Sequence, residues 1–233
     1  IYKDFFQFNE GCGGDFIWSA SAFWGIPWLE AILGCAIFSN METGSLYATP
    51  TNGFENADDI PDFSDTNPWV IKLGEYMDAL CERSAGRWPV GISDVLSCLY
   101  GSESFIYRML EDPEDILSAG EKVTEAFIAT ANFQLERIEP FYGGIGSFYY
   151  NMWAPRNTVW YQEDACALLS PQLYKKFIEP YAKEIVCSLK NVIMHQHSVG
   201  YVPTKSYLAM GVTALELHID EGGPSARELY STY

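Results

Sequence analysis

Hydrophobic positions along the chain alternate between the spacing of amphipathic helices and the spacing of strands. Over residues 69–84, apolar side chains recur at intervals of three and four directly after Pro68, a residue suited to the first turn of a helix. Asp112 and Pro113 then supply an N-cap and a first helical position, and the apolar pattern behind them predicts a long helix ending near residue 138. Further helices are predicted over 104–110, from Ser170 and Pro171 to about residue 185, over 203–210, and from Ser225, whose capping box Glu228 completes.

Short apolar runs typical of strands stand between these helices, over residues 87–94, 158–164, 191–197 and 214–220. Strands that alternate with helices imply parallel strands joined by crossover helices, so the expected fold class is α/β, as a sheet or a barrel. The 233 residues are 48% hydrophobic and contain no repeat or low-complexity linker, which predicts one domain over 1–233. Because the chain begins in an aromatic-rich segment and stops just after a helix signal, we expect this domain to be incomplete at both ends.

All three histidines lie in the last two predicted strands. Side chains two positions apart on a strand share a face, so His195 and His197 are expected to be neighbours. By the same alternation Glu216, His218 and Asp220 share a face of the next strand, while the leucines and isoleucine between them face the covering helices. If the two strands are adjacent, these imidazoles and carboxylates meet at the carboxyl ends of the strands, where barrel enzymes have their active sites.

A cluster of imidazole and carboxylate groups suits a metal ion or a proton-transfer site. Zinc accepts both ligand types and keeps one coordination position open when it is catalytic. Asp164, at the end of the preceding strand, would reach the same edge, where it orients a substrate or caps the turn into the next helix. The roles expected are catalysis for Asp164 and His195, metal binding for His195, His197, His218 and Glu216, and substrate binding for Asp94 and Asp220.

The residues of the last strand also have structural interpretations. His218 would equally suit a core position in which backbone groups satisfy both ring nitrogens. Glu216 and Asp220 would equally form ion pairs with Arg227 or Lys205. The spacing of these residues leaves both interpretations open.

Charge and cysteine content narrow the classes of function. Asp and Glu outnumber Lys and Arg by 31 to 14, and the resulting net charge of −17 disfavours nucleic acid and anionic membrane surfaces as partners. No apolar run approaches the roughly 18 to 20 residues that a membrane span needs. The six cysteines contain no CxxC pair and lie in apolar surroundings, which is typical of buried free thiols in a reducing cytoplasm. We therefore expect a soluble cytoplasmic protein that acts on a small molecule.

Three segments give the chain a resemblance to a known family: RWPVGISDVLSCLYGSESFIYRMLEDPEDI at 87–116, DACALLSPQLYKKFIEPYAKEI at 164–185 and VIMHQHSVG at 192–200. With them the chain resembles the uroporphyrinogen decarboxylase superfamily from about Arg87 to Tyr230, and the middle segment is the most specific. The resemblance implies a (β/α)8 TIM barrel, from which this chain lacks N-terminal and C-terminal elements.

The superfamily includes metal-independent porphyrinogen decarboxylases and zinc-dependent methyltransferases that move a methyl group between a corrinoid and a thiol. In the methyltransferases a His-x-Cys motif after a strand and a later Cys hold zinc, which stabilises the acceptor thiolate. His195 aligns with that His, whereas His197 occupies the Cys position, and the later Cys would lie beyond Tyr233. The decarboxylases carry an arginine-rich loop near the N-terminus, and residues 1–60 contain no arginine.

Three functions remain in competition. The main hypothesis is a methyltransferase-like enzyme in which zinc on the histidine cluster activates a thiol or another nucleophile toward a corrinoid carried by a partner protein. The first alternative is a metal-independent decarboxylase in which Asp164 and His195 orient the substrate and transfer a proton. The second alternative is a barrel that binds a small molecule or a corrinoid protein without catalysis.

Overall fold

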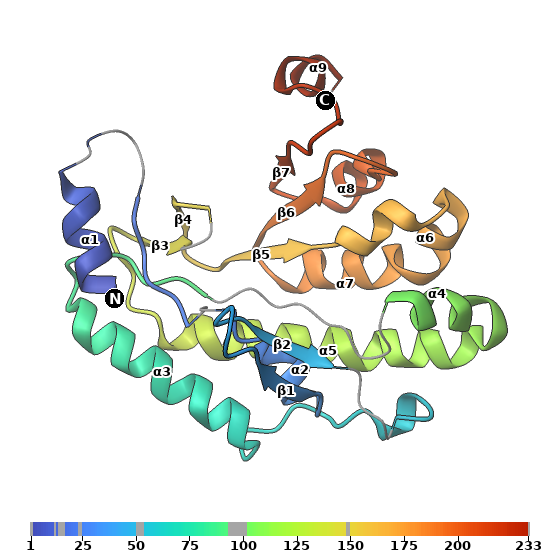
Figure 1. The fold of residues 1–233 in the computed structure, drawn as a ribbon, viewed down its shortest axis with the longest axis horizontal. Coiled ribbons are helices and arrows are strands. Elements are labelled where there is room, and N and C mark those ends of the chain that lie inside the picture. The colour runs from blue at the N-terminus through green and yellow to red at the C-terminus, as the bar shows by residue number, and fades with distance from the viewer. Residues whose placement is uncertain are drawn as a thin grey trace.

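The computed structural model describes residues 2–11, 13, 17–22, 25–49, 54–92, 102–147 and 150–232 (Figure 1). The α-helices are α1 (Tyr2–Glu10), α2 (Trp28–Ile32), α3 (Pro68–Ser84), α4 (Ser102–Glu111), α5 (Pro113–Arg137), α6 (Pro171–Phe177), α7 (Glu179–Ser188), α8 (Thr204–Met210) and α9 (Ala226–Thr232). Two 3-10 helices are η1 (Ala57–Asp59) and η2 (Asp164–Leu168). The strands are β1 (Ala36–Ser39), β2 (Leu46–Thr49), β3 (Gly144–Ser147), β4 (Met152–Pro155), β5 (Thr158–Gln162), β6 (Asn191–His197) and β7 (Ala214–His218).

The sheet that positions the histidines is three-stranded and parallel, in the order β5-β6-β7. Helices α6 and α7 connect β5 to β6, and α8 connects β6 to β7, so the predicted alternation of strands and helices is confirmed for this part of the chain. The described residues add two antiparallel hairpins, β1-β2 and β3-β4. Within the described ranges the strands do not close into a barrel, so the α/β class is established and the (β/α)8 barrel is not.

One face of this sheet is covered by helices. Val159 and Val192 belong to the same hydrophobic core as apolar residues of α5 and α7, and Figure 1 shows these two helices on one side of the β5–β6 pair. Met194 packs beside Tyr174 of α6 and Tyr207 of α8 in a second cluster. Since successive side chains point to opposite faces, His195 and His197 lie on the other face of β6.

Close backbone contacts link three segments upstream of the parallel sheet. Ala20 forms a parallel bridge with Val90, and the backbone N–H of Gly146 donates to the carbonyl of Val90 over 3.3 Å. A Cβ atom on Gly91 would lie 1.9 Å from the carbonyl oxygen of Gly146. This approach therefore requires glycine at position 91.

Local start signals predicted α3, α5 and α9, whereas α1 and α2 were not predicted. Asn67 caps α3 with Pro68 at its first position, and Asp112 caps α5, which ends one residue before the predicted Ile138. At α9 the backbone N–H of Ser225 donates to Glu228 Oε2 over 2.8 Å, as the predicted capping box requires.

Other elements differ from the sequence predictions. The single helix expected from Ser170 to about residue 185 is two helices, because α6 ends before Ile178 and Pro180 lies in the first turn of α7, which begins at Glu179. The strand expected over 158–164 ends at Gln162, and Asp164 starts η2. Asp94, with the end of the strand predicted over 87–94, lies outside the described residues.

Glu30 of α2 is an ionisable residue inside the core. Its side chain is 4% exposed, and its Oε2 has no hydrogen-bond partner among the described residues. Burial raises the pKa of this carboxyl from 4.5 to about 7, against a smaller opposing effect of a backbone hydrogen bond. The protonated form of Glu30 is therefore favoured in the folded chain over a wider pH range than in the unfolded chain.

Two sequence predictions concern membrane-spanning segments and the burial of the cysteines. In the part of the chain that the structure describes, no helix is both long and apolar enough to cross a membrane. The described cysteines are free thiols: Cys35 and Cys166 are buried as predicted, Cys81 is half-buried, and Cys187 is exposed. The prediction of burial is wrong for Cys187, which lies in the last turn of α7.

Candidate metal centre

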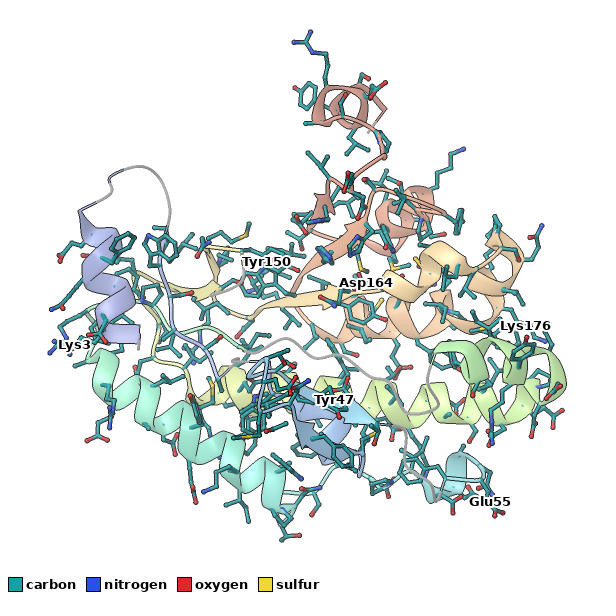
Figure 2. The ribbon with its side chains drawn as sticks, viewed as in Figure 1. Lys3, Tyr47, Glu55, Tyr150, Asp164 and Lys176 are labelled. Carbon is teal, nitrogen blue, oxygen red and sulfur yellow. The ribbon has the colours of Figure 1, made fainter. Side chains whose placement is uncertain are left out.

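The carboxyl ends of the three parallel strands bring the predicted site residues together. His195 pairs in register with Gln162 on β5 and Glu216 on β7, and His197 pairs with His218. Residues in register on parallel strands point to the same face, so these side chains form two layers at one edge of the sheet. Asp164 lies two residues after the end of β5, at the start of η2, and Figure 2 labels it there.

Two of the histidines are each held by a carboxylate at Nδ1. Glu216 Oε2 lies in hydrogen-bond contact with His195 Nδ1, and Asp220 Oδ1 lies 2.6 Å from His197 Nδ1. The second oxygen of Asp220 accepts the backbone N–H of Ser198 over 2.9 Å. The hydrogen bond from His197 lowers the pKa of Asp220, so this carboxyl remains charged.

The Nε2 atoms of the same two rings face a third carboxylate. Asp164 Oδ1 lies 3.7 Å from His195 Nε2 and 4.0 Å from His197 Nε2, and the ligand atoms of the three residues lie within 4.8 Å of one another. Gln162 Nε2 donates to the other oxygen of Asp164 over 3.2 Å. His195 is 7% exposed, whereas the side chain of Asp164 is 44% exposed, so the group is open to a ligand from the Asp164 side.

A second cluster adjoins the first. His197, His218 and Asp220 also offer one ligand atom each within 4.8 Å of one another, and the rings of His197 and His218 are 5.0 Å apart between centroids. His218 is exposed, so its interpretation as a core histidine is wrong. Glu216 and Asp220 contact imidazoles in the described residues, where the alternative interpretation expected Arg227 or Lys205.

A buried polar network behind β6 was missed by sequence reasoning. Gln196 Nε2 donates to the backbone carbonyl of Glu163 and to the hydroxyl of Tyr207, both over 3.1 Å, and Tyr207 donates to Glu163 Oε2 over 2.9 Å. Burial raises the pKa of Glu163 to about 7, against hydrogen bonds that lower it, and burial raises the pKa of the Cys166 thiol to about 12. Since Gln196 and Glu163 directly adjoin His195, His197 and Asp164 in sequence, the network fixes the backbone from which the site residues project.

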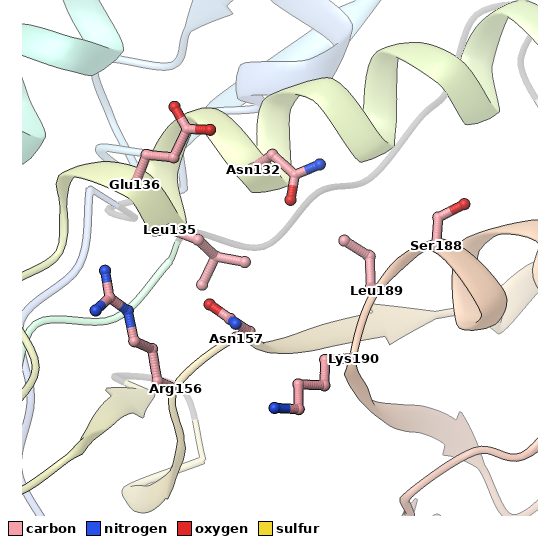
Figure 3. Close-up of a pocket in the computed structure, with 8 residues that line it drawn as sticks. All are labelled: Asn132, Leu135, Glu136, Arg156, Asn157, Ser188, Leu189 and Lys190. Carbon is pink, nitrogen blue, oxygen red and sulfur yellow. The ribbon is translucent and has the colours of Figure 1, made fainter.

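A pocket of about 280 Å³ lies at the opposite edge of the parallel sheet (Figure 3). Arg156 and Asn157 directly precede β5, and Ser188 to Lys190 directly precede β6, so this pocket is at the amino ends of the strands. The other lining residues come from α5: Asn132, Leu135 and Glu136. This pocket is thus separate from the histidine cluster at the carboxyl ends.

Comparisons with known proteins give a similarity of fold and no match of sequence family. No protein-family model matches the chain, and no curated protein matches it either. The chain is similar to the solved structure of a methyltransferase from Methanosarcina mazei, with a TM-score of 0.62 at 14% sequence identity. The match covers 84% of this chain and 56% of that protein, so the chain spans little more than half the length of the methyltransferase. The chain therefore shares the fold of a methyltransferase over most of its length.

Proposed function

We propose that the chain belongs to a methyltransferase-like enzyme whose metal centre is formed by Asp164, His195 and His197. The observation that carries the proposal is the orientation of the two imidazoles, which present Nε2 toward one carboxylate oxygen while a separate carboxylate holds each Nδ1. Metal-binding histidines usually donate their other ring N–H to such a partner. The shared methyltransferase fold supports the reaction class, and the resemblance to the uroporphyrinogen decarboxylase superfamily supports zinc as the metal.

The donor set fits a catalytic zinc ion. Two imidazole nitrogens and one carboxylate oxygen are a known set of three protein ligands, which leaves the fourth tetrahedral position for a substrate atom. The same set also suits iron(II), so the identity of the metal is part of the test. Zinc bound there would stabilise the thiolate form of an acceptor thiol near neutral pH.

The remaining residues orient the ligands in this proposal. Glu216 and Asp220 act through His195 and His197, which assigns both carboxylates to positioning in place of the metal-binding and substrate-binding roles expected from the sequence. The Gln162 amide holds one oxygen of Asp164 and leaves the other directed at the imidazoles. Catalysis by Asp164 is thereby replaced in the proposal by metal binding, because its carboxylate oxygen faces both Nε2 atoms.

Methyl transfer from methylcobalamin to a small thiol tests the proposal. The methyl group leaves cobalt as it bonds to the thiol sulfur, and the cobalt(I) cobalamin that remains is followed by its absorbance. The purified protein should contain zinc, should lose at least about tenfold in rate after treatment with a chelator, and should recover when zinc is returned. His197→Ala should not recover, whereas Glu221→Gln, an exposed acidic residue next to Asp220, should behave as the wild type.

Two results of this experiment would contradict parts of the proposal. A wild-type protein that holds no stoichiometric metal, and whose activity survives chelation, would contradict the metal centre. Iron in place of zinc would contradict the assignment of the metal while retaining the ligand set.

A second candidate, metal-independent decarboxylation, is favoured by the Glu216–His195 contact. A carboxylate that holds Nδ1 of an imidazole leaves Nε2 to exchange a proton with a substrate, as general acid–base catalysis requires. Chelator-resistant decarboxylation that His195→Ala abolishes would select this candidate. Non-catalytic binding of a small molecule or a corrinoid protein would instead leave ligand binding intact in His195→Ala, with no turnover in either protein.

We also propose that the sheet is part of a (β/α)8 barrel in the complete protein. The parallel strands β5-β6-β7 and the backbone contacts among the segments around Ala20, Val90 and Gly146 support an arc of strands. A crystal structure of the complete protein tests this proposal, since an open sheet flanked by helices on both faces would contradict it.

A further inference from the structure

His197 offers a ligand atom on both sides of its ring. Nε2 faces Asp164 and belongs to the centre described above, whereas Nδ1 faces Asp220 in the second cluster. A neutral imidazole has one nitrogen that donates and one that accepts, but an imidazole that loses both ring protons can bind a cation at each nitrogen. His197 therefore belongs to both clusters and could bridge two cations, one at each ring nitrogen.

His218 has no part in the first centre but belongs to the second cluster. Its ligand atom groups with those of His197 and Asp220, and does not group with those of Asp164 and His195. The side chain is exposed at the end of β7, and its ring lies 6.5 Å from that of His195 but 5.0 Å from that of His197 between centroids. An exposed imidazole next to a second imidazole and a charged carboxylate is a suitable third ligand for a divalent cation.

The charge at this edge of the sheet favours more than one cation. Asp164, Glu216 and Asp220 are three carboxylates whose ion pairs, within the described residues, are all with histidine and none with lysine or arginine. One divalent cation leaves these carboxylates in excess by one negative charge. With His197 as an imidazolate the site carries four negative charges, which two divalent cations balance.

We infer that His197, His218 and Asp220 form a second divalent-cation site, bridged through the His197 ring to the centre on Asp164 and His195. The second cation takes the place of the proton between His197 Nδ1 and Asp220 Oδ1, so its binding releases that proton to solvent. Asp220 then acts as a ligand of the second cation, and it returns to holding the His197 N–H when the second site is empty. This inference rests on the proposed function only through the shared residue His197.

Metal titration of the chelator-stripped protein tests the inference, with zinc as the probe and calorimetry as the readout. The wild type should bind two equivalents per chain. His218→Ala should keep the first equivalent with its affinity within about threefold, and should lose at least about tenfold in affinity for the second. Glu221→Gln is the matched control, because it removes a neighbouring exposed charge that belongs to neither cluster, and it should bind both equivalents.

Copper(II) gives a second readout that does not depend on affinity. Two copper ions joined by an imidazolate are magnetically coupled, so the signal of isolated copper(II) in electron paramagnetic resonance should diminish as the second equivalent binds to the wild type. In His218→Ala the signal of the single ion should persist. Two uncoupled copper signals in the wild type would overturn the bridge.

The outcomes separate this inference from the proposed function. One equivalent of zinc in the wild type, with the same affinity in His218→Ala, would overturn the second site and leave the first intact. No binding by the wild type would overturn both. Two equivalents that persist in His218→Ala at unchanged affinity would also overturn the second site as assigned.

Discussion

The positioning role of Glu216 makes a quantitative prediction about metal affinity. Glu216→Gln keeps the length and shape of the side chain and its ability to accept a hydrogen bond, but removes the charge from the partner of His195 Nδ1. If that carboxylate holds the ring so that Nε2 faces Asp164, its neutralisation should weaken metal binding without unfolding the chain. Glu216 lies on β7 and is in register with His195 on the neighbouring strand β6, so the effect depends on the pairing of these two strands.

The expected magnitude follows from the type of hydrogen bond. Bonds to charged groups contribute about 1.5–3 kcal/mol and neutral bonds about 0.5–1.5 kcal/mol, so loss of the charge should cost about 1–1.5 kcal/mol. The Glu216 side chain is 31% exposed, and solvent screening places the effect in the lower part of this range. Since about 1.4 kcal/mol corresponds to a factor of ten, zinc affinity should fall about fivefold to tenfold. Glu216→Ala removes the hydrogen-bond partner of His195 completely, so its zinc affinity should fall further, toward the loss of about a hundredfold that is the upper limit for such partners.

Competition for zinc with a chromogenic chelator measures these affinities, and circular dichroism of the same samples verifies the fold. Glu221→Gln serves as the control because it makes the same change of charge at an exposed position outside both clusters. If Glu216→Gln and Glu216→Ala both bind zinc within twofold of the wild type, Glu216 does not position His195 for a metal. An equal loss in Glu221→Gln would attribute the effect to net charge alone.

Three further predictions concern stability. Burial raises the pKa of Glu30 from 4.5 to about 7 in the folded chain, so the free energy of unfolding should fall by about 3 kcal/mol as pH rises from about 4.5 to about 7, and should level off above that. Urea unfolding of Glu30→Gln should lack this part of the pH dependence. An unchanged pH dependence in the variant would contradict the assignment to Glu30. Gly91→Ala should lower the free energy of unfolding by about 1–3 kcal/mol, because the new Cβ meets the backbone of Gly146, and wild-type stability would show that the two segments separate easily. Tyr207→Phe removes the hydroxyl that donates to the buried Glu163 and accepts from Gln196. This change should lower the free energy of unfolding by about 1–3 kcal/mol in the same assay, whereas a loss below about 0.5 kcal/mol would contradict the network.

The sequence predicted those elements whose limits are set by local signals such as helix caps. The N-cap of Asp112 with Pro113 and the capping box of Ser225 with Glu228 act within a few residues, so they mark α5 and α9 without knowledge of the packing. The break between α6 and α7 was missed, because the apolar spacing continues across Pro180 on the same buried side. The hairpin β3-β4 was missed because the GIGS segment that pairs with β4 has no alternating apolar pattern.

The candidate site shows the same division. Alternation along one strand placed His195 and His197 on one face, since the period of two is a property of the strand itself. Which carboxylate holds which imidazole depends on the register between β6 and β7 and on the turn after β7, and neither can be read from spacing. The hydrogen bonds of Gln196 connect residues that are far apart in the sequence, so no local sequence pattern predicts them.

Anomalous X-ray diffraction at the zinc absorption edge, from crystals of the purified protein, tests the central claim most directly. We expect an anomalous peak about 2.0–2.2 Å from His195 Nε2, His197 Nε2 and an oxygen of Asp164, with Glu216 in contact with Nδ1 of His195. A zinc-supplemented crystal without a peak at these three residues, or one in which the imidazoles turn Nε2 away from Asp164, would contradict the account.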